Sequence, residues 1–227
     1  MPQPSNFGDN RQLAWCIHCG GGTGTRDHVP SRVFLDEPYP LNLPVVPACQ
    51  SCNEGFSKDE EYLACLVDCA RLGSVNQSSD HRPKILRILT TKPVLAAKLA
   101  RARHESNDGI LFSLEPKRVR NVVLKLARGH AAFELNEPQR DSPTQLTYNP
   151  LLFMRHDIRE CFETPPCPSV YPEVGSRAMQ RMIIAGNNVM TEWVVVQPTR
   201  YRYLVTINNG ILVRIVIGEY LGCEVRW

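Results

Sequence analysis

The chain has 227 residues, enough for one large domain or a small module joined to a larger one. Hydrophobic residues make up 43% and charged residues 22%, which excludes the disordered, collagen-like and membrane-embedded classes. No apolar run reaches the roughly 18 residues of a spanning helix, and the opening MPQPSNFGDN lacks an apolar signal region, so we expect a cytoplasmic protein. The net charge of +3 favours a polyanionic partner only if basic residues cluster.

The first part of the chain is a polar leader, residues 1–14, followed by a stretch rich in cysteine, glycine and proline at 15–57. Nine cysteines without an export signal favour metal binding or burial over disulfides. Two-residue gaps let two CxxC pairs close one tetrahedral shell of four thiolates around a zinc ion. We therefore predict a structural Zn²⁺ that contributes directly to folding. Its ligands are Cys16, Cys19, Cys49 and Cys52.

Three helices are expected in the middle of the chain. The capping-box spacing of Ser57 and Glu60 predicts a helix that begins at Ser57 and ends at Gly73. Cys65 and Cys69 lie on it among leucine and valine, which favours packing over a second metal site. After a polar linker, 74–83, helices are expected at about 84–103 and 116–128, the last opening at Pro116 and closing at Gly129.

The C-terminal part is predicted to form an antiparallel sheet. Segment 138–176 is rich in proline and is expected to be irregular. Residues 192–196, 201–207 and 211–217 have the composition of strands, and Asn208-Asn209-Gly210 supplies a tight turn between the last two. These features predict an antiparallel meander.

A second group of polar residues lies between the two CxxC pairs and directly after the second pair. Asp27-His28-Val29-Pro30 lies between the pairs, Asn42 follows in a Leu-Asn-Leu segment, and Asn53 comes directly after Cys52. In this order, over about residues 15–62, the motif resembles the HNH endonuclease family with its ββα-metal fold. Together, the resemblance and the helices and strands expected after it predict an α+β protein with two parts. These are a zinc-stapled HNH module, residues 15–73, and an accessory region of helices and a C-terminal antiparallel sheet, residues 74–227.

The resemblance also implies roles for single residues. Asp27 and Asn53 would hold a catalytic Mg²⁺ or Mn²⁺, and His28 would act as the general base. Asn42 would hold the His28 loop in place, although an asparagine in such a position is as often a turn former. Imidazole titrates near neutrality, and a site with few protein ligands leaves room for water and phosphate oxygens. We therefore expect hydrolysis of phosphodiester bonds in DNA, with RNA left open as a substrate.

Basic side chains supply candidate contacts to nucleic-acid phosphates. Lys117, Arg120 and Arg128 fall near one face of the helix expected at 116–128, with its valines opposed. Lys125 belongs to the same basic segment, and Arg26 precedes the proposed catalytic pair. A solvated helix face is the commoner explanation of such a pattern.

Two other classes of protein compete with the nuclease. A zinc-dependent nucleobase deaminase needs His-x-Glu and Pro-Cys-x-x-Cys, whereas here Ala48 separates Pro47 from Cys49 and no HxE lies near the pairs. A non-catalytic zinc-ribbon module that binds nucleic acid or protein would share the cysteines but would not need Asp27, His28 and Asn53. Some stand-alone bacterial HNH proteins act in phage defence, so a second copy of the chain or a defence-system protein stays open as a partner, by analogy alone.

Overall fold

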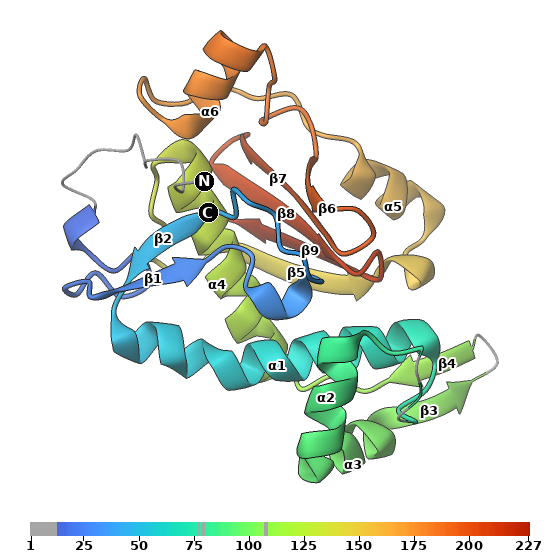
Figure 1. Cartoon of the computed structure of the whole chain (residues 1–227). Helices are drawn as coiled ribbons and strands as arrows, with labels where there is room; N and C mark the ends of the chain where they lie inside the picture. Colours follow the sequence, from blue (N-terminus) through green and yellow to red (C-terminus); the bar gives the residue numbers. More distant parts are fainter. Residues whose placement is uncertain (1–12, 77, 79, 107–108) are drawn as a thin grey trace.

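The computed structural model describes residues 13–76, 78, 80–106 and 109–227, so the predicted leader lies almost wholly outside the described residues. The chain is mixed α and β (Figure 1). The helices are α1 (Gln50–Leu72), α2 (Pro83–Thr91), α3 (Pro93–Ala102), α4 (Pro116–Leu135), α5 (His156–Glu163) and α6 (Arg177–Gln180). Short helical turns follow at η2 (Arg32–Phe34), η3 (Leu151–Phe153) and η4 (Arg181–Ala185).

The strands form one large sheet and two hairpins. The large sheet has the order β5-β9-β8-β7-β6 and is antiparallel throughout. Its strands are β5 (Gln145–Pro150), β6 (Val194–Gln197), β7 (Tyr201–Ile207), β8 (Ile211–Ile217) and β9 (Leu221–Arg226). The hairpins are β1 (Thr25–His28) with β2 (Val45–Ala48), and β3 (Arg103–Ser106) with β4 (Gly109–Phe112).

The predicted meander is confirmed at β7 and β8. The turn between them uses Asn209 at φ 51° and Gly210 at φ 114°, a left-handed conformation that these two residue types adopt most readily. The prediction missed β9, and it missed β5 and α5 inside the segment expected to be irregular. Both β5 and α5 lie between proline-rich stretches that hide their periodicity.

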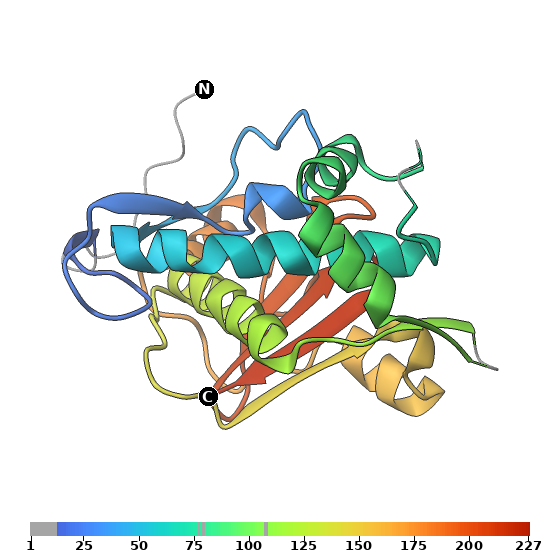
Figure 2. The same ribbon diagram turned by 90° about the horizontal axis from the view of Figure 1, so that it is seen from below.

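The helices are stacked on the sheet in two layers. Helix α4 covers one face of the sheet, and α1 packs on the outer side of α4 (Figures 1 and 2). A single hydrophobic core includes Leu63 and Leu66 of α1, Leu126 of α4 and Val213 of β8. The boundary predicted at residue 73 coincides with the end of α1, and the core continues across it. Among the described residues, no helix combines the length and apolar character needed to cross a membrane.

Helix α1 begins earlier than the sequence predicted. It starts at Gln50, with Cys49 as the N-cap, because the Cys49 Sγ accepts a hydrogen bond from the Cys52 N–H at 3.4 Å. Ser57 lies inside the helix, where its hydroxyl donates to the Glu54 carbonyl, so the predicted capping box is wrong. The predicted end is confirmed: Gly73 is left-handed at φ 67°. Cys65 and Cys69 are buried, as expected.

The segment expected to form one helix at 84–103 forms two. Pro93 has no N–H to donate and disfavours a helical conformation in the residue before it. Lys92 accordingly adopts φ −125° and ψ 71°, which ends α2 and begins α3.

Helix α4 runs past its predicted end at Gly129. Gly129 lies inside the helix, and α4 ends instead at Asn136, its C-cap, which is left-handed at φ 62°. A Cβ at residue 129 would lie 2.5 Å from the Cγ2 of Val29, in the loop after β1. Gly129 therefore allows the β1–β2 hairpin to approach α4, and Val29, Phe133 and Val46 pack together at this contact.

We predict that Gly129→Ala destabilises the protein. Alanine is the better helix former, but its methyl group would overlap Val29, and overpacking of this kind costs about 1–3 kcal/mol. Gly55→Ala on α1 is the matched control, because nothing lies within 4 Å of the added Cβ, and we expect it to stabilise the protein. Urea unfolding measures both. A Gly129→Ala protein as stable as wild type would contradict the close approach.

Candidate metal centre and buried lysine network

The β1–β2 hairpin brings the two CxxC pairs together. In this hairpin Asp27 pairs with Val46 and His28 with Val45. The first pair lies in a tight loop closed by the Cys16 N–H bond to the Gly21 carbonyl, with Gly20 left-handed at φ 75°. The second pair forms the first turn of α1, directly after β2. The hairpin thus brings Cys16 and Cys19, before β1, close to the second CxxC pair, after β2.

The four cysteine sulfurs form one cluster, as predicted. Their ligand atoms all lie within 4.8 Å of one another, and the Sγ atoms of Cys19 and Cys49 are 3.8 Å apart. A tetrahedral zinc ion with Zn–S bonds of about 2.3 Å places its sulfurs roughly 3.8 Å apart. The donor set and the spacing therefore fit a structural zinc ion.

Two of the cysteine thiols have shifted pKa values. Burial opposes ionisation of Cys16, but backbone N–H groups of Cys49, Cys19 and His18 lower its pKa to about 7. For Cys52, burial and the neighbouring sulfurs raise the pKa. A divalent cation bound by the four cysteines would deprotonate its thiol ligands.

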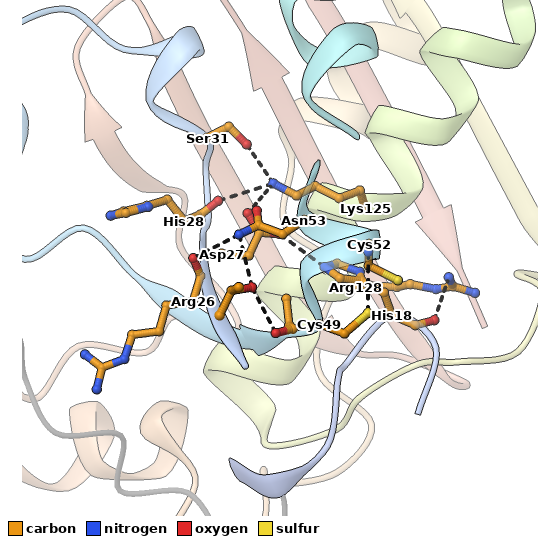
Figure 3. Close-up of polar contacts among 12 residues, drawn as sticks. His18, Arg26, Asp27, His28, Ser31, Cys49, Cys52, Asn53, Lys125 and Arg128 are labelled. Atoms are coloured by element: carbon orange, nitrogen blue, oxygen red, sulfur yellow. Dashed lines mark hydrogen bonds and ion pairs between the residues drawn. The ribbon is translucent and has the colours of Figure 1, made fainter. Parts of the chain in front are cut away.

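Asp27 lies at the centre of a buried polar network (Figure 3). The side chain is 4% exposed, and its Oδ1 and Oδ2 lie 2.8 Å from Lys125 Nζ and 3.1 Å from His18 Nε2. Lys125 reaches in from α4 and also contacts Glu60 Oε1 at 2.6 Å and Ser31 Oγ at 2.7 Å. One buried ammonium therefore joins β1, the loop after β1, α1 and α4. Burial by itself would raise the pKa of Asp27, but the His18 hydrogen bond and the Lys125 charge hold it below its usual value.

His28 projects away from this network. Successive side chains of a strand point to opposite sides, so Asp27 faces Lys125 whereas Arg26 and His28 face away from it (Figure 3). The imidazole is half-buried. Burial and the nearby positive charge of Arg32 lower the pKa of His28, so the ring is neutral and able to accept a proton at pH 7.

Asn53 joins the first turn of α1 to β1. Its Nδ2 donates to Thr25 Oγ1 at 3.2 Å and to the Arg26 carbonyl at 3.4 Å. The structure thus gathers three of the four predicted catalytic residues at the junction of hairpin and helix. Asn42 lies in an exposed turn before β2, and in the part of the chain that the structure describes its side chain makes no hydrogen bond to the His28 loop.

The basic residues have different surroundings. Lys117 and Arg120 are exposed on α4, and Arg26 is exposed on β1. Arg128 is half-buried, and its guanidinium donates to the carbonyls of His18, Arg140 and Asp141. Lys125 is only 1% exposed, so this member of the basic segment is not available to contact phosphates.

The chain matches no family model, no curated protein and no solved structure in the comparisons made. The site must therefore be interpreted from its own geometry.

Sequence analysis missed the network around Lys125. A signal was present, because Lys125 lies one turn after Val122 and directly before Leu126, at the border of the apolar face of α4. Glu60 likewise lies at the start of the buried part of α1. A single cation and a single anion at core-facing positions of two helices indicate a buried pair, because isolated buried charges are rare.

We predict that the purified protein contains one zinc ion per chain. Cys49→Ser should remove the zinc and unfold the hairpin, because the ion supplies folding free energy that this loop-rich segment lacks. Cys223→Ser, at a buried cysteine of β9 outside the cluster, is the control and should keep its zinc. Elemental analysis and circular dichroism measure the two effects. Unchanged zinc content in Cys49→Ser would exclude the four-cysteine site.

Lys125→Met should lower the free energy of unfolding by about 3–5 kcal/mol, because it leaves Asp27 and Glu60 buried without their cation. Lys117→Met, at an exposed lysine of the same helix, should change it by less than about 0.5 kcal/mol. Adding Asp27→Asn to Lys125→Met should recover part of the loss. Equal stability of the two methionine variants in urea would show that the network contributes nothing.

Proposed function

We propose that the chain is a metal-dependent endonuclease of the HNH type that hydrolyses phosphodiester bonds in DNA. The observation that supports this most directly is that Asn53, in the first turn of α1, contacts β1, the strand that carries Asp27 on one side and His28 on the other. The Asn53 bonds to Thr25 and to the Arg26 carbonyl fix this junction. A hairpin leading into a helix, with these residues in these places, is the arrangement that the resemblance implied.

The chain's own residues suit the chemistry of water attack on a phosphate. His28 is neutral, partly accessible and directed away from the buried network, so it can take a proton from a water molecule. The backbone carbonyl of His28 lies 3.4 Å from Lys125 Nζ, and the neighbouring Asp27 is fixed by the same ammonium. These two contacts hold the strand that carries the base.

The proposed catalytic ion is Mg²⁺ or Mn²⁺, which prefers oxygen donors of the kind that Asp27 and Asn53 carry. The Asn53 amide donates through Nδ2, which leaves the oxygen that hard cations prefer free of partners within the described structure. Each Asp27 oxygen accepts one bond and keeps a second lone pair. Asp27 and Asn53 would hold the ion, which when bound offsets charge on the scissile phosphate and leaving oxygen.

One observation favours a non-catalytic zinc module that binds nucleic acid or protein. Asp27 is already paired with Lys125 and His18, which gives the carboxylate a structural role that requires no chemistry. A cleavage assay separates the two functions, because only the nuclease turns over substrate.

His28→Ala should lower divalent-dependent cleavage of supercoiled plasmid by about 10²–10⁴ while zinc content and melting temperature stay as in wild type. Its side chain touches neither the cysteine cluster nor Lys125, so loss of the base leaves both intact. Asn53→Ala should weaken metal use instead, with activity partly restored as Mg²⁺ is raised.

The control is His156→Ala, which removes an exposed histidine on α5 and should cleave as wild type does. Undiminished nicking by a folded His28→Ala protein would remove His28 from the mechanism. Absence of cleavage of both DNA and RNA by wild type with any divalent ion would favour the binding module.

A further inference from the structure

The face that carries His28 continues past the hairpin to a second element, α2. After β1 the chain forms η2, then a loop through Tyr39, and α2 lies beside this loop (Figure 2). Between the loop and α2 is an open groove of about 340 Å³. Its lining includes Leu35, Tyr39, Pro83, Lys84 and Arg87. The groove thus combines an apolar floor, one aromatic ring and two cations.

Two cations, Lys84 and Arg87, line this groove, and a third, Arg32, lies beside its Tyr39 ring. The Arg32 guanidinium lies 5.4 Å and the Lys84 Nζ 5.1 Å from the centre of the Tyr39 ring. Lys84 Nζ donates to the Tyr39 hydroxyl at 2.7 Å, and Arg87 is exposed one turn along α2. In the described part of the chain, none of Arg32, Lys84 and Arg87 forms an ion pair.

The acidic groups at the groove do not neutralise it. Asp36 is held by Arg82 and Arg200, so its charge is already balanced. Glu37 accepts a hydrogen bond from the Tyr39 hydroxyl at 2.9 Å and is the single carboxylate left to oppose three cations. The groove therefore keeps a net positive charge, which attracts a polyanion.

Arg32 links the proposed base to the groove, because it acts on His28 and lies beside Tyr39. Arg32 opens η2 only four positions after His28, and its charge acts on that imidazole. Arg26 and His28 point away from Lys125, and hence away from α4 (Figure 3). By contrast, Lys117 and Arg120 belong to α4, and α1 lies between α2 and α4 in both ribbon views (Figures 1 and 2).

We propose that this groove binds the phosphate backbone of the nucleic acid, with the strand running from His28 past Arg32 to Lys84 and Arg87. The inference rests on the proposed nuclease function and names the surface that its substrate occupies. The exposed cations of α4 are then a solvated face. Tyr39 holds Lys84 at the groove, and its ring is available beside the phosphates to an unpaired base.

The test compares two double variants that each remove one lysine and one arginine. The groove variant is Lys84→Gln/Arg87→Gln, and the control is Lys117→Gln/Arg120→Gln. Affinity for a labelled DNA duplex is measured by fluorescence anisotropy across a NaCl series, without added divalent ions. Each phosphate contact contributes about 0.9 to the slope of log affinity against log salt. We expect the groove variant to lose roughly two units of slope and the control to keep the wild-type slope.

The single variant Arg87→Gln guards against a folding defect, because the Arg87 side chain makes no hydrogen bond or ion pair within the described residues. This variant should still lose about one unit of slope. A wild-type slope in the groove variants, or a lowered slope in the control, would overturn the inference, as would absence of duplex binding by wild type. Plasmid cleavage is followed separately. Groove-dependent binding without cleavage would reject the nuclease and keep the groove, whereas cleavage with an unchanged groove slope would reject the groove alone.

Discussion

The buried ammonium of Lys125 is the interaction on which the arrangement of the N-terminal segment depends. A charge that is 1% exposed is stable only when its partners are all in place. Those partners come from β1, the loop after it and α1, while the lysine belongs to α4. Docking of the hairpin on α4 is therefore specified by charge at Lys125 and by shape at Gly129, one helical turn further on.

The cysteine cluster and the lysine network act at different places on the same hairpin. The cluster joins the loop before β1 to the first turn of α1 and determines local geometry. The lysine network determines how the hairpin and its cysteine cluster pack against α4. Because strand side chains alternate, the burial of Asp27 against Lys125 is what directs His28 outward. The alternation along β1 thus gives both the buried ion pair of Asp27 and the accessible imidazole of His28.

The features that could be predicted from sequence are those encoded by neighbouring residues. The CxxC spacing predicted the sulfur cluster, Asn209-Gly210 predicted the turn between β7 and β8, and Gly73 predicted the end of α1. The errors concern residues whose partners are distant in sequence. Gly129 resembles a helix end until Val29 is placed beside it, and Lys125 resembles a surface cation although 97 positions separate it from His28, whose carbonyl it contacts. Local patterns can place a charged residue at a core-facing position, but they do not identify its distant partners.

The alternation of side chains along β1 also bears on which basic surface a nucleic acid would follow. The two candidates are the exposed face of α4 and the groove beside α2. A helical-wheel pattern groups Lys117, Arg120 and Arg128, but Arg128 uses its guanidinium on three backbone carbonyls. Asp27 faces α4, so a nucleic-acid strand that reaches His28 would have to approach from the opposite side of β1. On that side, among the described residues, Arg26 and Arg32 lie near His28 in the chain without ion-pair partners, and α2 adds Lys84 and Arg87. In the proposed complex a phosphate backbone would therefore meet positive charges next to His28 on the α2 side of α1, whereas α4, with Lys117 and Arg120, lies on the other side of α1.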